Sequence, residues 1–194
     1  MNTKLPVIET KRLILREIQL NDCYDMFEYA NLNDFGPMAG WQPHRTVGET
    51  RQIIQLFLDK VKYGQLGTFA VILKEENKMI GTLELHTYVR GYKAELGYSI
   101  NPKYQGFGYA TEASIEAIIW GFEELGLSRI ECTTYTYNKP SQRVCEKLRF
   151  TYEGVRKKGY QLYDGSLHDI KCYAITDDEY FSNKYQKLIY ELKQ

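Results

Sequence analysis

A glycine-containing segment at residues 105–110 (QGFGYA) has the residue types that point most clearly to a chemical task. It precedes a stretch in which apolar residues recur at helical spacing, so it should form a turn that leads into a helix. The first backbone N–H groups of a helix lack partners within the helix, and the helix dipole places partial positive charge beside them. Glycine lets an anion approach these groups closely, so the segment predicts a site for phosphate or pyrophosphate. Taken alone, a plain strand-to-helix turn explains the glycines equally well.

Two familiar phosphate-binding loops do not match this segment. A P-loop needs a second glycine five positions after Gly106, followed by lysine, whereas Thr111 stands there and no lysine follows. A dinucleotide-binding loop needs glycine or alanine at that same position and begins directly after its strand. Here residues 101–105 intervene, so neither loop is predicted.

Three side chains on two predicted strands are candidates for accepting a proton from a nucleophile. Glu84 and His86 alternate along one strand and therefore share a face, and Glu95 lies near the start of the next strand. A carboxylate or an imidazole can act as a general base toward an amine. Each of the three, taken alone, is more often a solvated strand residue, so the choice of base stays open.

The histidines and cysteines do not predict a metal site. The three histidines share no ligand motif, and the four cysteines form no CxxC pair. Buried core thiols are the main interpretation of the cysteines, with Cys145 as a weaker candidate nucleophile.

Strand and helix patterns alternate along the chain. The patterns predict strands at residues 10–17, 68–74, 79–88, 93–100 and 128–135, and a hairpin over 150–175 that turns at Asp164 and Gly165. They predict helices from Asn21 or Asp22 to Ala30, after Val47 as far as Gly64 or Gly67, from near Tyr109 to Gly126, over 141–148, and from a Thr176 cap onward. Residues 31–47 should form a loop. A strand meander followed by strand, helix, strand and helix predicts an α/β (α+β) fold, with a mixed central sheet and helices on both faces.

The glycine segment resembles the coenzyme A loop of the GNAT acyltransferases. The family pattern Q/R-x-x-G-x-G/A is matched by Gln105, Gly108 and Ala110. Residues 94–100 (AELGYSI) are similar to the family's central strand, and residues 138–150 (NKPSQRVCEKLRF) are similar to its second motif. Residues 10–16 (TKRLILR) resemble the branch that acetylates the amino termini of ribosomal proteins.

The resemblance covers residues 7–175, which are predicted to form a single acetyltransferase domain. One departure is Arg149, which stands where the family usually has a glycine. A left-handed backbone there costs a side chain about 1 kcal/mol, so the turn should survive. A C-terminal helix over 176–194 is expected to pack on the domain or on a second copy of the chain in a homodimer.

The resemblance also implies a cosubstrate site for acetyl-coenzyme A. Two central strands should splay apart so that the backbone of Tyr98, Ser99 and Ile100 pairs with the pantetheine arm. Asn138 and Ser141 should reach the same arm, although both are also favoured helix caps. The pyrophosphate should lie on the backbone amides of the loop: Gln105, Gly106, Phe107, Gly108, Tyr109 and Ala110.

An amine nucleophile must lose a proton when it attacks a thioester, so Glu95 or Glu84 is expected to serve as the base. The resemblance implies that Ser141 protonates the departing thiolate. Tyr98, Tyr135 and Tyr137 are alternative proton donors. The expected acceptor is a primary amine, first of all a protein or peptide amino terminus. Alternatives are a polyamine or amino-bearing antibiotic, or a regulatory module that binds coenzyme A without turnover. Three residues of the 31–47 loop are candidates for lining the acceptor pocket or for forming a small local core: Phe35, Trp41 and His44.

Composition restricts the partners of the protein. The 25 basic residues balance the 25 acidic ones, so no overall field attracts nucleic acid or a membrane surface. No apolar run approaches the roughly 18 residues that span a bilayer, and the first residues lack a signal-peptide core. A cytoplasmic enzyme without a nucleic-acid, membrane or metal partner is therefore expected.

Overall fold

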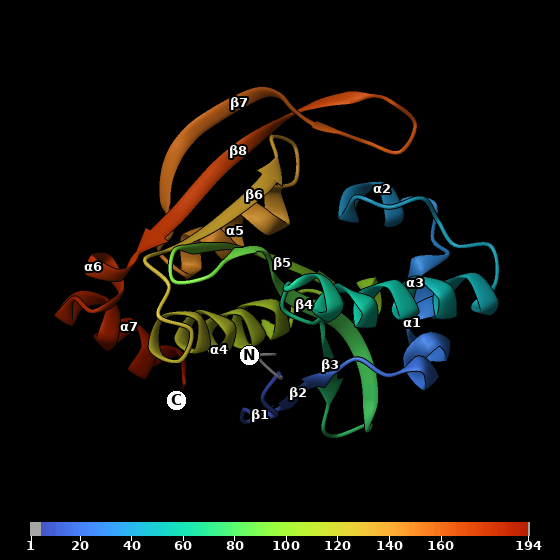
Figure 1. Ribbon diagram of the computed structural model, residues 1–194, viewed down its shortest axis with the longest axis horizontal. Coiled ribbons are helices and arrows are strands. Elements are labelled where there is room, and N and C mark those ends of the chain that lie inside the picture. Colours follow the sequence, from blue (N-terminus) through green and yellow to red (C-terminus); the bar gives the residue numbers. More distant parts are fainter. Residues whose placement is uncertain (1–4, 194) are drawn as a thin grey trace.

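One eight-stranded sheet forms the centre of the protein (Figure 1). The computed structural model describes residues 5–193. Along the sheet the strands run β1-β2-β3-β4-β5-β6-β8-β7, and every neighbouring pair is antiparallel except β5 and β6. The strands are β1 Ile8–Glu9, β2 Leu13–Glu17, β3 Phe69–Leu73, β4 Lys78–Val89, β5 Lys93–Ile100, β6 Arg129–Tyr135, β7 Thr151–Gln161 and β8 Leu167–Thr176. The mixed sheet expected from the sequence is confirmed.

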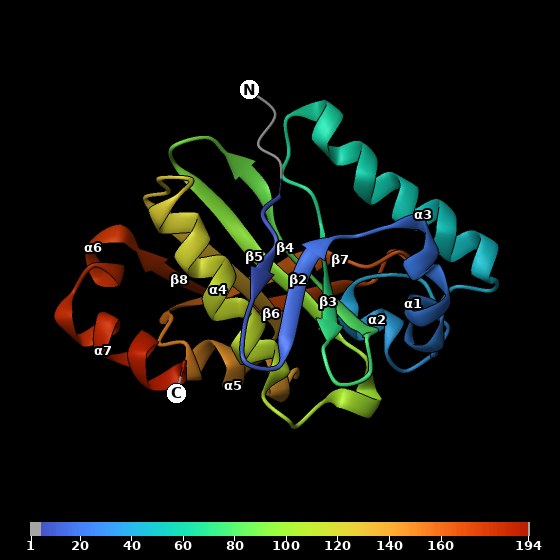
Figure 2. The same ribbon diagram turned by 90° about the horizontal axis from the view of Figure 1, so that it is seen from below.

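Helices cover both faces of this sheet, as expected. The α-helices are α1 Cys23–Ala30, α2 Gly36–Ala39, α3 Val47–Asp59, α4 Tyr109–Glu123, α5 Lys139–Lys147, α6 Asp177–Tyr180 and α7 Asn183–Leu192. Figure 2 shows α6 and α7 at the opposite end of the molecule from α1 and α3. Short 3₁₀ turns lie at Leu20–Asp22, Lys60–Tyr63 and Pro102–Tyr104.

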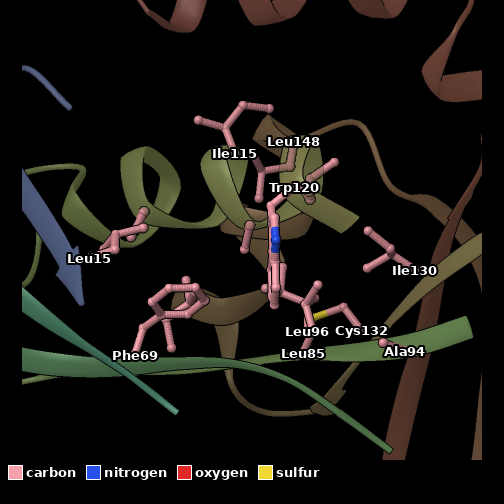
Figure 3. Packing of buried hydrophobic residues seen from close by; sticks show 14 of the residues in the cluster. Leu15, Phe69, Leu85, Ala94, Leu96, Ile115, Trp120, Ile130, Cys132 and Leu148 are labelled. Carbon is pink, nitrogen blue, oxygen red and sulfur yellow. The ribbon is translucent and has the colours of Figure 1, made fainter. Parts of the chain in front are cut away.

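Strand alternation divides the buried residues between two cores. Phe69 and Val71 of β3 point into the larger core beneath α4, whereas Ala70 and Ile72 point into a smaller core with α1 and α3. In the larger core the rings of Phe69 and Trp120 meet edge to face with centroids 5.5 Å apart (Figure 3). Each large apolar side chain buried in this way contributes about 1.5–3 kcal/mol. This packing fixes α4, and therefore its first turn, against the sheet.

The two parallel strands stay together over only three residue pairs. Lys93, Ala94 and Glu95 of β5 lie opposite residues 129–131 of β6, whereas β6 pairs with β8 along its whole length. Beyond Glu95 the edge of β5 that faces β6 has no strand partner within residues 5–193. The splayed strand pair expected from the family resemblance is thus present, and it leaves backbone N–H and C=O groups open for another extended chain.

Three details differ from the sequence-based expectations. Residues 31–47 contain the short helix α2, which begins at Gly36. Pro37 lies in its first turn, where proline is favoured because no helical hydrogen bond needs its missing N–H group. Asp22 precedes α1 but makes no capping bond through its side chain. Its carboxylate accepts instead from the backbone N–H of Gln19 at 2.7 Å and from Arg16 at 2.7 and 2.8 Å.

The C-terminal segment also differs, because it forms two helices where one was expected. Thr176 caps α6 through a reciprocal contact with Glu179, but α6 ends after one turn. Ser182 then adopts an extended backbone and caps α7 by accepting from the N–H of Tyr185. Tyr185 is buried in the larger core, and its hydroxyl donates to the carbonyl of Leu148 at 2.9 Å.

Candidate active site

A cleft of about 1820 Å³ passes beside the splayed strands and collects most of the predicted site residues. Successive side chains of β5 point to opposite faces of the sheet, and the lining includes both sets. Glu95, Gly97 and Ser99 line it on one face, and Tyr98 and Ile100 line it on the other. The cleft therefore connects the two faces at the point where β5 and β6 part.

The glycine loop closes one end of this cleft. Gly108 takes the N-cap position of α4 with a φ of +87°, a left-handed conformation that glycine adopts far more readily than other residues. The side-chain amide of Gln105 donates to the carbonyl of Ile100 at 2.9 Å and so ties the loop to the end of β5. The loop and first-turn residues that line the cleft are Gln105, Gly106, Gly108, Tyr109, Ala110 and Thr111. These residues present the first amides of a 15-residue helix, a suitable geometry for a phosphate group.

Phe107 is the one predicted loop residue that does not line the cleft. Its side chain is 61% exposed, and its ring stacks on Tyr109 with centroids 6.0 Å apart. Its carbonyl accepts from Arg12 at 3.0 Å. Phe107 is thus held by its ring on Tyr109 and by its carbonyl on Arg12, and its side chain stays outside the cleft.

Asn138 and Ser141 stand at the start of α5, on the same side as the glycine loop. The side-chain oxygen of Asn138 accepts from the N–H of Ser141 at 3.2 Å, so Asn138 does act as a helix cap. The hydroxyl of Ser141 lies 3.0 Å from that of Tyr98. Burial raises the pKa of Tyr98 well above its ordinary value, which keeps this hydroxyl protonated at neutral pH. A proton donor therefore lies on the β5 face that carries α5.

The thiols near this point form part of the core. The sulfur atoms of Cys132 and Cys145 lie 3.5 Å apart, and both residues are buried. The contact with Cys145, together with burial, raises the pKa of Cys132 well above its ordinary value. A thiolate is thus disfavoured at Cys132, and the burial of Cys145 agrees with the main interpretation of the cysteines as core residues.

The three candidate bases lie together on the other face of the sheet. His86 stands directly opposite Glu95, and Glu84 stands opposite Gly97, across the β4–β5 pair. A Cβ atom at Gly97 would lie 3.0 Å from the His86 ring, so glycine leaves the room that this ring occupies. The shared face predicted for Glu84 and His86 thus also includes Glu95.

Hydrogen-bond partners distinguish the two carboxylates. Glu84 forms an ion pair with Lys60 at 2.6 Å and also accepts from Thr68 at 3.3 Å. Glu95 accepts from the hydroxyl of Thr133 at 2.5 Å, and no cation among residues 5–193 pairs with it. The charge of Glu84 is compensated within the protein, whereas that of Glu95 remains available to a ligand.

Aromatic side chains enclose the side of the cleft where Glu95 lies. Phe35, Trp41 and His44 line it, and Phe35 and Trp41 also pack against the smaller core, so both interpretations taken from the sequence apply. The hydroxyl of Tyr160 in β7 donates to the carbonyl of Gly40 at 3.4 Å, so the β7–β8 hairpin meets the segment after α2. Figure 1 shows this hairpin arching over the sheet toward α2. The side of the cleft where Glu95 lies is thus bridged by two segments that are 120 positions apart in the sequence.

Tyr135 and Tyr137 were named from the sequence as alternative proton donors. Their rings stack with centroids 5.2 Å apart, and Tyr135 lines the cleft, whereas Tyr137 is half exposed. Burial raises the pKa of both hydroxyls. Neither hydroxyl has the serine partner that Tyr98 has.

Sequence reasoning missed several residues that contribute to the cleft. Thr133, the partner of Glu95, lies two positions after Glu131 on β6, so the side chains of Thr133 and Glu131 share a face of the sheet. Because Glu131 pairs with Glu95, the contact between Thr133 and Glu95 could be found only once the β5–β6 register was known. Arg143 and Lys147 stand one turn apart on α5, line the cleft and are exposed. The i, i+4 spacing of these two cations was a signal present in the sequence.

Two further findings concern residues 5–193 only. Within this range no group of three or more His, Cys, Asp or Glu side chains is arranged to hold a metal ion. The same range contains no helix that is long and apolar enough to cross a membrane.

Comparison with known proteins adds independent information. The family model described as "Acetyltransferase (GNAT) domain" matches residues 12–151. The N-acetyltransferase p20 of Bacillus licheniformis, described as uncharacterized, is 30% identical over 177 residues, which cover 91% of this chain and 99% of that protein. The ribosomal protein uS5 alanine N-acetyltransferase of Escherichia coli is 27% identical over 180 residues, or 89% and 92% of the two chains. The crystal structure of a GNAT-family acetyltransferase from Bacillus anthracis matches with a TM-score of 0.79 and 31% identity, over 90% and 100% of the two chains.

Proposed function

The chain belongs to the GNAT acetyltransferases, enzymes that depend on acyl-coenzyme A, and we propose that its acceptor is the α-amine of a protein or peptide amino terminus. The observation that carries this proposal is the carboxylate of Glu95, which has no ion pair among residues 5–193 and lies at the point where the cleft crosses the sheet. Its position separates the two substrates. The cosubstrate approaches from the α4–α5 side, and the amine approaches from the side of Glu95.

The proposed cosubstrate site consists of the glycine loop and the free edge of β5. The pyrophosphate lies on the amides at the start of α4, and the pantetheine arm extends along Tyr98, Ser99 and Ile100 as an added strand. Arg143 and Lys147 add positive charge on the same side of the cleft. This site fits acetyl-coenzyme A, because the phosphates of the cosubstrate bind to positive charge and its extended pantetheine arm pairs with an open strand edge.

In the proposed reaction the amine nitrogen attacks the thioester carbonyl carbon, and the carbon–sulfur bond breaks. Glu95 accepts the proton that the amine loses, either directly or through one water molecule. Thr133 holds one carboxylate oxygen, which leaves the other oxygen for the amine. The departing thiolate receives a proton from the Tyr98–Ser141 pair on the opposite face, and Ser141 can recover a proton from Tyr98 across 3.0 Å.

The pKa of the acceptor amine favours an α-amine over a polyamine. An α-amine has a pKa of about 7.7–8.0, so its deprotonation at pH 7 costs about 1 kcal/mol, compared with about 4.6 kcal/mol for lysine. A single weak base is therefore sufficient. Glu84 is neutralised by Lys60, whereas Asp34 and Glu49 line the cleft without an ion pair among residues 5–193, so the preference for an α-amine rests on the lower pKa of that amine. The uS5 alanine named for the Escherichia coli relative is also an amino-terminal type of acceptor.

Paired peptides test this proposal. One peptide carries a free amino terminus and an acetylated internal lysine, and its partner carries an acetylated terminus and a free lysine. Coenzyme A release with each peptide measures kcat/KM, and mass spectrometry locates the new acetyl group. The proposal expects at least hundred-fold preference for the free terminus. Equal use of the two peptides, or faster reaction with spermidine, would contradict it, and binding without release would indicate a non-catalytic module.

Three earlier expectations stay predictions: a single domain over residues 7–175, a homodimer, and a cytoplasmic location. Burial of Tyr185 and Leu188 in the larger core supports packing of α7 on its own domain. The oligomeric state is accessible to light scattering.

A further inference from the structure

Residues 10–12 form a cluster of contacts with the first turn of α4, about 100 positions away in the sequence. The Glu112 carboxylate accepts from the Thr10 hydroxyl at 2.6 Å and from the Arg12 backbone N–H at 3.0 Å. Its other oxygen accepts from the Arg12 guanidinium at 2.6 and 2.7 Å. Every oxygen of this carboxylate is thus occupied by the segment that precedes β2.

Arg12 also contacts the glycine loop itself. Its guanidinium donates to the carbonyl of Phe107 at 3.0 Å and lies over the ring of Tyr109, 4.4 Å from the centroid. One side chain therefore joins the carboxylate at position 112 to the two loop residues that flank Gly108. The planar guanidinium suits this task, because its N–H groups point in several fixed directions within one plane.

The hydrogen bond from Arg12 to the Phe107 carbonyl also fixes the direction of the Gly108 N–H group. The carbonyl of Phe107 and the N–H of Gly108 belong to the same planar trans peptide, so they point in opposite directions. Fixing the carbonyl toward Arg12 therefore aims the Gly108 N–H away from Arg12. Gly108 lines the cleft, whereas Arg12 lies outside its lining. An N–H group that points away from Arg12 therefore points toward the cleft.

The same contacts neutralise the negative charge of Glu112, which would otherwise repel a phosphate at the start of α4. A carboxylate in the first turn of a helix is attracted by the same partial positive charge as a phosphate. In this protein Glu112 is neutralised by Arg12 and held on the side of Thr10. The helix start thus remains available to a bound anion.

We infer that Arg12, held by Glu112 and Thr10, is a positioning residue that orients the loop 105–110 for the pyrophosphate of acetyl-coenzyme A. This inference rests on the proposed cosubstrate site. It gives residues 10–12 a role in cosubstrate affinity that is separate from their contribution to the fold.

The test is calorimetric titration of acetyl-coenzyme A into Arg12→Gln, with kcat and KM measured alongside. We expect Kd and KM for acetyl-coenzyme A to rise about ten-fold or more, the equivalent of one weakened charge-assisted hydrogen bond. The kcat at saturating cosubstrate should stay within about three-fold, because Arg12 does not reach the acceptor side of the cleft. Arg12→Lys keeps a positive charge but lacks the planar fork, so its affinity should also fall.

Arg16→Gln is the matched control, because Arg16 forms a similar two-pronged contact with Asp22 away from the loop. It should lower the melting temperature comparably and leave Kd within about two-fold. If Arg12→Gln and Arg12→Lys bind as the native protein does, or if Arg16→Gln weakens binding as much as they do, the contact is only a structural brace. Gly108→Val in the same titrations separates this failure from a failure of the cosubstrate site, since native affinity in that variant would contradict the site itself.

Discussion

Replacement of Glu95 by glutamine tests the assignment of the base. The amide oxygen of glutamine can still accept from Thr133, so the side chain should keep its place while it loses its charge. At pH 7 about one-tenth of an α-amine with a pKa near 8 is unprotonated, which corresponds to about 1 kcal/mol. Without the base only this fraction reacts, so turnover should fall by about ten-fold or more, where ten-fold is the minimum and lies below the roughly hundred-fold lower end of typical general-base effects.

The pH profile makes the test specific. Above pH 9 the α-amine is largely unprotonated without help, so the deficit of Glu95→Gln should shrink to about three-fold or less. Coenzyme A release is followed from pH 6 to 9.5 at saturating acetyl-coenzyme A, and calorimetry checks that cosubstrate affinity is unchanged. Glu84→Gln is the control and should change turnover by less than about three-fold, because Glu84 is already paired with Lys60. A deficit that appears only in Glu84→Gln, or one that persists in Glu95→Gln at pH 9.5, would refute the assignment.

The remaining predictions concern the proton donor and the pH limits of stability. Tyr98→Phe and Ser141→Ala should each lower kcat about ten-fold, and the double variant should lose little more, because the two hydroxyls form one hydrogen-bonded pair; full additivity would show that they act separately. Burial raises the pKa of Tyr98, Tyr29 and Tyr185 above the unfolded value near 10, so their contribution to stability is complete below pH 10 and is lost as pH rises further. Burial alone would raise the pKa of Glu112, but hydrogen bonds from Thr10 and Arg12 outweigh burial and lower that pKa. The contribution of Glu112 to folding stability is therefore present above pH 4.5 and is lost as the pH falls further. Melting temperatures should therefore decline above pH 10 and below pH 4.5, and a constant value across either limit would contradict the corresponding assignment.

Local patterns in the sequence predicted most elements of the fold. Strand β5 was predicted at residues 93–100 and is found at Lys93–Ile100, because apolar alternation and Pro102 mark its limits. The left-handed backbone expected at Arg149 is present, with a φ of +55°. Helix α2 was missed, since four residues are too few to show a helical period. The break between α6 and α7 depends on Ser182, which looks like an ordinary helix residue until its capping bond is known.

The site was predictable where it is local in sequence and not where distant segments meet. The glycine loop and the Asn138–Ser141 turn carry their geometry in a few consecutive residues. The contact between Tyr160 and Gly40 and the one between Arg12 and Glu112 depend on how the whole sheet brings distant residues together. The choice between Glu84 and Glu95 likewise needed the partners of each carboxylate, because both are strand glutamates with the same intrinsic chemistry.

Calorimetric titration of acetyl-coenzyme A into Gly108→Val tests the central claim most directly. A Cβ atom at Gly108 would meet only Arg12, at 3.6 Å, so the turn has room for it. The φ of +87°, however, strains a β-branched residue by about 1–2 kcal/mol and should displace the amides at the start of α4. Loss of two charge-assisted hydrogen bonds to phosphate, at about 1.5–3 kcal/mol each, would weaken binding by about two to four orders of magnitude. The account predicts at least a hundred-fold rise in Kd for a variant that still melts cooperatively, and native affinity in such a variant would contradict it.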